Sequence, residues 1–246
     1  RDRSPSRGLG DVYKRQLVYN FEGEDVAKWL NSMGIAAFVL ECRLPSDEHD
    51  NAEDVPLIDA MRAMRVIRGR AQEFGIDEAK IGVMGFSAGG FMAALLSTAY
   101  ESDVYADYKY KDEYDKLSAR PDFAVCSYPV ISIDDCIEAG KRYMSEEQVL
   151  ERISDSKAKI LHKYNPDKLV RPDMPPVFIC ETDDDRTTLS ENSVGFYMAA
   201  RKAGVSAELH IFRTGGHGYG CGDDFAQTGE WKVLFTKWIK SIGIIS

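Results

Sequence analysis

Residues 80–90 read KIGVMGFSAGG, an apolar run that leads into a serine flanked by glycines. Within it, Gly85-Phe86-Ser87-Ala88-Gly89 has the form G-x-S-x-G. A strand that turns abruptly into a helix crowds the positions two before and two after the serine, so small residues there permit a strained turn that exposes the serine Oγ. The pattern predicts a nucleophile elbow, and a glycine-rich turn with a capping serine is the alternative.

Strand and helix patterns alternate on both sides of this motif. Apolar runs predict strands at residues 35–40, 80–84, 123–128, 175–180 and 207–212, and we expect those at 35–40 and 123–128 to be buried. Helical spacing predicts helices at residues 25–32, 57–74, 89–100, 192–203 and 231–239. This alternation indicates a mainly parallel sheet with helices on both faces. Right-handed crossovers then bring the loops that follow the strands to one edge.

Two longer segments interrupt this alternation. Residues 101–117 are rich in charge and tyrosine; they either line a sugar site or, as we expect, pack over a neighbouring helix. Residues 130–172 are helical in character and contain Ser145-Glu146-Glu147-Gln148, a capping-box start. We interpret this second segment as a small helical lid insertion, with plain surface helices as the alternative.

The composition argues against several classes of protein. With 246 residues and 44% hydrophobic content, the chain is most simply one domain with a large core. A formal net charge of -9 argues against nucleic acid or an anionic membrane as the main partner. The five cysteines form no C-x-x-C pair, so neither a disulfide framework nor a zinc site is predicted. We expect no metal, no cofactor and no membrane span.

The first sixteen residues, RDRSPSRGLGDVYKRQ, are polar, basic and aperiodic. Residues 11–16 resemble the translation of an adapter that tags DNA libraries, so we interpret residues 1–16 as an adapter-like tail, with an ordinary disordered arm as the alternative. The folded domain then covers residues 17–246, and we expect the first strands of its fold to be missing. The chain as written predicts a cytoplasmic protein, and the loss of its native N-terminus leaves secretion open.

A serine and a histidine stand in loops at the predicted sheet edge. A serine hydroxyl is a poor nucleophile at neutral pH, so Ser87 needs an imidazole that takes its proton and returns it to the leaving group. His217 lies between Gly215-Gly216 and Gly218, which allow a tight loop to bring its ring over the edge. We predict that Ser87 is the nucleophile and His217 the base.

A carboxylate must fix the histidine tautomer and stabilise the imidazolium. Asp183, Asp184 and Asp185 are consecutive after the strand at 175–180, and a turn presents only one of them to the histidine. Asp184 is our choice, which gives the chain order Ser87, Asp184, His217 that α/β hydrolases have. A cation site at the triplet is the alternative, but no further carboxylate-rich spacing supports it.

Five segments carry a family resemblance: Gly82–Gly90, Ser118–Phe123, Thr182–Asp185, Glu191–Ser193 and Gly215–Gly220. They are similar to the α/β-hydrolase carbohydrate esterases, the acetylxylan-esterase and feruloyl-esterase-like group, from about residue 22 to the end. The resemblance implies a serine esterase that cleaves small acyl esters, chiefly acetyl esters, of plant polysaccharides or oligosaccharides through an acyl-enzyme. The first member of the family's D-D pair is its triad acid, which ranks Asp184 above Asp185.

The chain departs from this family at two places. Where the family has a proline after the D-D pair, this chain has Arg186-Thr187-Thr188-Leu189. The family's H-G-G-G-like loop has no counterpart before Phe21. In the family that loop donates the second N–H of the oxyanion hole, and Ala88 supplies the first. Losing one donor costs about a hundred- to a thousandfold in kcat.

Two other functions fit some of these residues. A peptidase of the prolyl-oligopeptidase kind shares the elbow, the D-D turn and the G-H loop, although such enzymes carry a tyrosine where Ala88 stands and a large propeller. A non-catalytic reading makes the chain a pseudo-enzyme or a catalytically impaired fragment. Labelling of Ser87 by a fluorophosphonate probe separates the catalytic readings from the inert one.

Overall fold

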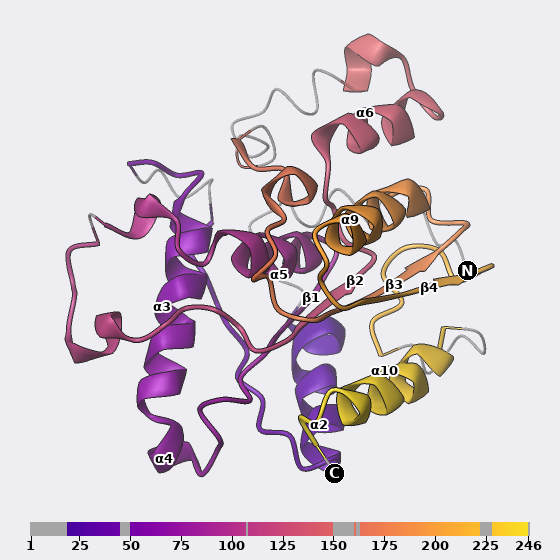
Figure 1. The fold of residues 1–246 in the computed structure, drawn as a ribbon. Helices are drawn as coiled ribbons and strands as arrows, with labels where there is room; N and C mark the ends of the chain where they lie inside the picture. Colours follow the sequence, from indigo (N-terminus) through magenta and orange to yellow (C-terminus); the bar gives the residue numbers. More distant parts are fainter. Residues whose placement is uncertain are drawn as a thin grey trace.

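Among the described residues, four parallel strands form one sheet (Figure 1). The computed structural model describes residues 19–44, 50–106, 108–149, 160, 163–221 and 228–245, so the predicted tail at 1–16 lies outside the described residues. The strand order is β1-β2-β3-β4, and each strand pairs in parallel with its neighbour. The strands are β1 (Val83–Phe86), β2 (Ala124–Ser127), β3 (Val177–Thr182) and β4 (Ala207–Phe212). The prediction of a mainly parallel sheet is confirmed.

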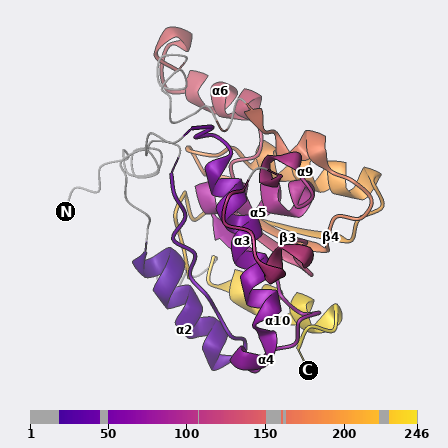
Figure 2. The same ribbon diagram turned by 90° about the vertical axis from the view of Figure 1, so that its left-hand side faces the viewer.

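Helices cover both faces of this sheet, and successive strand residues point alternately to the two layers. Val177 and Ile179 of β3 pack in one apolar cluster with residues of α5 and α9, while Phe178 and Cys180 pack in another with residues of α2 and α10. Figure 2 shows the same two layers from the side. These helices are α2 (Asp25–Ser32), α5 (Ala88–Ala99), α9 (Ser190–Lys202) and α10 (Glu230–Ser241).

A further long helix lies beside α5 (Figure 1). The predicted helix at 57–74 forms, but it breaks at Arg70, where φ is -107° and ψ is 17°, into α3 (Val55–Gly69) and α4 (Ala71–Phe74). Leu57 and Met61 of α3 are fully buried and share an apolar cluster with Leu95 of α5. The long helix is therefore held by its contact with α5 rather than by the sheet.

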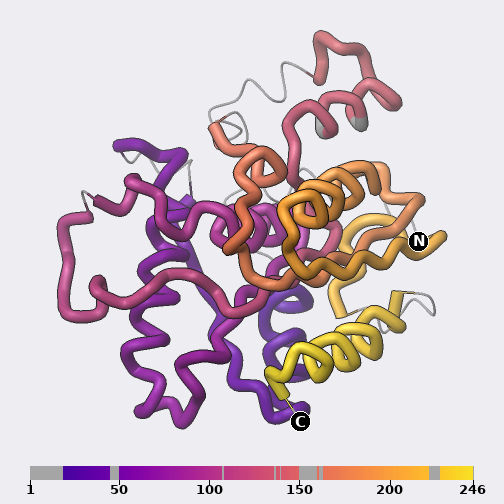
Figure 3. The backbone as a smooth tube through the Cα atoms, in the orientation of Figure 1, coloured from indigo at the N-terminus to yellow at the C-terminus, as the bar shows by residue number. Residues whose placement is uncertain are grey.

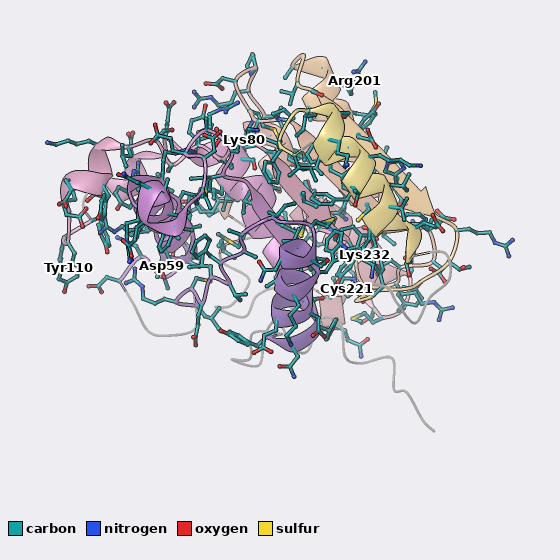
Figure 4. The ribbon with its side chains drawn as sticks, turned by 90° about the horizontal axis from the view of Figure 1, so that it is seen from below. Asp59, Lys80, Tyr110, Arg201, Cys221 and Lys232 are labelled. Atoms are coloured by element: carbon teal, nitrogen blue, oxygen red, sulfur yellow. The ribbon has the colours of Figure 1, made fainter. Side chains whose placement is uncertain are left out.

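The tyrosine-rich segment packs along α3, as the sequence led us to expect. It contains the short helices η2 (Asp103–Tyr105) and η3 (Glu113–Lys116). The Arg65 guanidinium lies 4.1 Å from the centre of the Tyr105 ring, and Tyr114 covers Gly69 so closely that an added Cβ would lie 2.2 Å from the ring. Tyr110 is 78% exposed and projects into solvent. Figure 4 shows it on the opposite side of the molecule from Cys221, which follows the loop of His217.

Residues 35–40 form no strand, which corrects the prediction of a buried strand there. Figure 3 follows this segment from the end of α2 past α3. Phe38 contacts Phe74 with ring centres 4.9 Å apart, yet Phe38 and Leu40 are 46% and 45% exposed. An apolar run is buried as a strand only where other strands and helices cover it. Within the described part of the chain, no strand pairs with residues 35–40.

The lid predicted at 130–172 is described only in part. Helix α6 (Ile133–Lys141) stands apart from the sheet in Figure 1, and η5 (Pro166–Leu169) contacts α5 and α9. Ser145 and Gln148 make the predicted capping box, with the Ser145 N–H donating to Gln148 Oε1 at 3.1 Å and the Gln148 N–H donating to Ser145 Oγ at 3.3 Å. Residues 150–159 and 161–162 lie outside the described residues. No helix in the described ranges is long and apolar enough to cross a membrane.

Candidate active site

Ser87 occupies a strained turn between β1 and α5. Its φ is 52° and its ψ is -115°, a conformation that costs a residue with a side chain about 1–3 kcal/mol. The Ser87 N–H donates to Ser127 O at 3.0 Å, which ties the turn to β2. A Cβ on Gly85 would lie 1.9 Å from Gly89 O, so only glycine fits there. This is the elbow geometry that the sequence predicts.

We expected crowding to require a small residue at Gly89, two positions after the serine, but the structure shows space there. A Cβ added at Gly89 would meet no described atom within 4 Å, so this position does not need glycine. A Cβ added at Gly90 would lie 2.9 Å from Pro129 Cβ, so the crowding falls one residue later. The reason is that the start of α5 turns Gly90, rather than Gly89, toward the end of β2.

His217 follows β4 and reaches the elbow over the edge of the sheet. Its Nε2 lies 2.9 Å from Ser87 Oγ. Gly216 and Gly218, on either side of it, have φ angles of 64° and 79°, which glycine adopts without a steric cost. The structure therefore brings the predicted nucleophile and base within hydrogen-bond distance.

The carboxylate beside His217 is Asp185, and our choice of Asp184 was wrong. Asp185 Oδ2 lies 2.7 Å from His217 Nδ1, and the Asp185 side chain is fully buried. An ionised carboxylate only accepts hydrogen bonds, so Nδ1 carries the proton and Nε2 is left to accept the proton of Ser87. The family pattern that ranked Asp184 first does not transfer to this loop.

Asp184 binds the same histidine loop at its backbone. Its Oδ1 accepts the N–H groups of Gly215 and Gly216, at 2.9 and 2.8 Å. The two neighbouring carboxylates point in different directions because they follow the sharp turn at the end of β3. Asp184 thus holds the residues that precede His217, while Asp185 holds the ring. Among the described residues, no group of three His, Cys, Asp or Glu side chains is placed to hold a metal ion.

Ala88 begins α5, directly after the nucleophile. The first N–H groups of a helix have no partner inside the helix, and the positive end of the helix dipole lies there. The Ala88 N–H is therefore suited to hold an oxyanion formed on a substrate attached to Ser87. We expect the second donor in the family's H-G-G-G-like loop, which has no counterpart before Phe21, and this expectation stays a prediction.

Comparison with family models matches residues 18–199 of the chain to BD-FAE. The chain belongs to the BD-FAE family. Its curated relatives include an acetylxylan esterase from Xylanibacter ruminicola, 31% identical over 228 residues, which make up 92% of this chain and 43% of that protein. Another is endo-1,4-beta-xylanase B from Butyrivibrio fibrisolvens, 31% identical over 209 residues, or 85% of this chain and 31% of that protein. The chain spans less than half the length of either.

Solved structures place this BD-FAE member among the α/β hydrolases. It superposes on an acetyl ester-xyloside bifunctional hydrolase from Caldicellulosiruptor lactoaceticus with a TM-score of 0.75 and 38% identity, over 91% of this chain and 77% of that one. A thermophilic esterase from Thermogutta terrifontis gives a TM-score of 0.70 and 26% identity, over 92% and 78%. The chain has the α/β-hydrolase fold, and the predicted resemblance to carbohydrate esterases is confirmed.

The loop that departs from the BD-FAE pattern supports Asp185. Asp185 Oδ1 accepts the N–H groups of Thr187 and Thr188, at 2.7 and 3.0 Å, and Thr188 Oγ1 donates to Oδ2 at 3.0 Å. Together with His217, these donors use both carboxylate oxygens and fix the plane of the group. An aspartate whose side chain accepts N–H groups two and three residues later is a common local turn. All three aspartates have non-proline residues at those two later positions, so the sequence held no signal that separates Asp185 from its neighbours.

Glu181 is a buried carboxyl group beside this acid that the sequence analysis missed. It lies in β3 with none of its surface exposed, accepts the Thr182 N–H at 2.9 Å and accepts a hydrogen bond from Ser193 Oγ at 3.3 Å. Burial raises the pKa of Glu181 well above its ordinary value, and the negative charge of Asp185 raises it further. Burial and the neighbouring Asp185 charge therefore both favour the neutral form of Glu181.

Proposed function

We propose that this chain is the catalytic domain of a serine esterase that hydrolyses small acyl esters, chiefly acetyl groups, on plant polysaccharides or their oligosaccharides. The observation that carries the proposal is the continuous hydrogen-bonded chain from Ser87 through His217 to Asp185 at a strained elbow. The relatives named as an acetylxylan esterase and an acetyl ester-xyloside hydrolase support the substrate class.

In the proposed first step, Ser87 Oγ attacks the acyl carbon while its proton passes to His217 Nε2. The Ala88 N–H donates a hydrogen bond to the developing oxyanion, and the Asp185 carboxylate stabilises the imidazolium through Nδ1. His217 then gives the same proton to the sugar oxygen as the ester bond breaks. The sugar leaves with a free hydroxyl, and the acyl group remains on Ser87.

In the second step, His217 takes a proton from water, and the resulting hydroxide attacks the acyl carbon of the acyl-enzyme. The proton returns from His217 to Ser87 Oγ as the carboxylic acid departs. The substrate in this proposal is a small-molecule or oligosaccharide ester, and no residue is assigned to a cofactor.

A fluorophosphonate probe tests the nucleophile. We expect the wild-type chain to be labelled and Ser87→Ala to remain unlabelled. Absence of labelling in a folded wild-type chain, verified by circular dichroism, overturns the proposal in favour of the non-catalytic reading.

Substrate panels then test the reaction class. We expect acetate release from acetylated xylan and from an activated acetate ester. Cleavage of a proline-containing peptide nitroanilide, without turnover of either ester, would support the peptidase instead.

A further inference from the structure

The loop that carries His217 has little rigidity of its own. Gly216, Gly218 and Gly220 all have positive φ angles, of 64°, 79° and 50°. Glycines lose more conformational entropy on ordering than other residues, so a loop that also contains Gly215, and thus four glycines, needs external contacts to hold one shape. Asp184 supplies such contacts before the histidine, through the N–H groups of Gly215 and Gly216.

Tyr128 supplies the matching contact after the histidine. Its hydroxyl accepts the Gly220 N–H at 3.0 Å and donates to Glu22 Oε1 at 2.8 Å. Glu22 belongs to η1 (Asn20–Glu24), and the neighbouring Phe21 ring would lie 2.5 Å from a Cβ added to Gly220. A segment distant in sequence therefore presses on the histidine loop at the point where Tyr128 binds it.

The Tyr128 ring also touches the histidine itself. It is fully buried, and its edge-on contact with the His217 ring has a centroid distance of 4.9 Å. Burial raises the pKa of the Tyr128 phenol well above its ordinary value, and the nearby Glu22 raises it further. The phenol accordingly keeps the proton that it donates to Glu22.

Strain at Tyr128 indicates that this placement is imposed by the surrounding structure. Its φ is 37°, in the left-handed region that bulky side chains rarely adopt. The backbone is held there because the Tyr128 N–H donates to Cys180 O at 2.7 Å. Residues in such conformations persist where their surroundings over-determine them, and they gather at active sites.

We propose that Tyr128 is a positioning residue for His217: its hydroxyl, held by Glu22, fixes the loop after the histidine as Asp184 fixes the loop before it. The proposal rests on the proposed esterase function. Its defining contact is the phenol oxygen between Glu22 and Gly220 rather than the bulk of the ring.

The variant Tyr128→Phe tests this contact, since it keeps the ring and removes only the hydroxyl. We expect kcat for an activated acetate ester to fall about tenfold, with KM unchanged. This loss corresponds to the usual energy of one buried hydrogen bond, here the one that holds the loop of His217. Tyr219→Phe is the matched control, because Tyr219 lies in the same loop, is 4% exposed and directs its hydroxyl only to the Cys180 sulfur at 3.4 Å among the described residues. We expect kcat of the control to stay within about twofold.

A second pair of variants tests the role of Glu22. Glu22→Gln keeps an oxygen that accepts from Tyr128 and should retain kcat, whereas Glu22→Ala should match Tyr128→Phe. Equal losses of kcat in Tyr128→Phe and Tyr219→Phe, or a lowered melting temperature with unchanged kcat, would show that Tyr128 only fills the core.

One readout does not depend on turnover. The His217 Nδ1 proton, bound to Asp185, should give a low-field proton resonance that disappears in His217→Gln. We expect it to broaden in Tyr128→Phe and to stay sharp in Tyr219→Phe. If the wild-type chain proves inactive, the esterase proposal fails, while this resonance still decides the role of Tyr128.

Discussion

Replacing Asp185 by asparagine should remove nearly all activity, although the two side chains have almost the same shape. The Oδ1 position accepts two backbone N–H groups, from Thr187 and Thr188, so the amide oxygen must stay there. The amide NH₂ then occupies the Oδ2 position, 2.7 Å from His217 Nδ1. A donor now faces the nitrogen that should donate, so the imidazole takes the opposite tautomer.

With that tautomer, the proton of His217 sits on Nε2 and points at Ser87 Oγ. The histidine can no longer accept the serine proton, and kcat should fall about 10⁴-fold, equivalent to about 5 kcal/mol of transition-state stabilisation. The fold should be retained, because asparagine preserves the contacts with the two threonine N–H groups.

Asp184→Asn is the matched control. It removes the same charge one residue earlier, and its oxygen can still accept the N–H groups of Gly215 and Gly216. We expect kcat within about threefold of wild type. The assay is turnover of an activated acetate ester, with the rate of fluorophosphonate labelling measured alongside. A larger loss in Asp184→Asn than in Asp185→Asn would refute the assignment of the acid.

Three further changes test the elbow, the buried carboxyl group and the support of the triad acid. Gly85→Ala places a Cβ 1.9 Å from the Gly89 backbone oxygen, so we expect loss of labelling and a lower melting temperature; a normal thermal transition would contradict the packing argument. The pKa of Glu181 is higher in the folded chain than in the unfolded chain, where it is about 4.3. Between these two pKa values the folded chain binds the extra proton, so the free energy of unfolding falls as pH rises through that range. Glu181→Gln should therefore gain stability over wild type in urea at pH 8 but little at pH 5, and an equal difference at both values would exclude a buried neutral acid. Thr188→Val removes one donor from Asp185 Oδ2 and should lower kcat by about three- to tenfold with KM unchanged. Thr187→Val is the control, because among the described residues Thr187 contacts Asp185 through its backbone N–H and not through its side chain.

The features that sequence patterns predicted are those fixed by chain order and local sterics. Parallel strands joined by helices bring every strand end to one edge, so Ser87 and His217 could be placed together without knowing any distance. Gly85 could be recognised because a strand-to-helix turn leaves no space for a side chain. These inferences need only the order of elements and the size of residues.

The features that sequence patterns missed depend on directions and distant partners. Which of three consecutive aspartates faces His217 depends on backbone dihedrals in one turn, and a family alignment gave Asp184 where the turn presents Asp185. The contact of Tyr128 with Glu22 joins residues 106 positions apart, which no local pattern encodes. The apolar run at 35–40 looked like a buried strand because its composition does not report which neighbours cover it.

That run should also affect how the chain behaves in concentrated solution. Phe38, Val39 and Leu40 are 46%, 40% and 45% exposed, and they lie in a six-residue uncharged segment with strong strand preference. Such segments pair with copies of themselves and start aggregation, and a single lysine in the middle is the usual natural deterrent. Val39→Lys should thus keep the protein monodisperse at higher concentration while leaving the elbow and its histidine untouched.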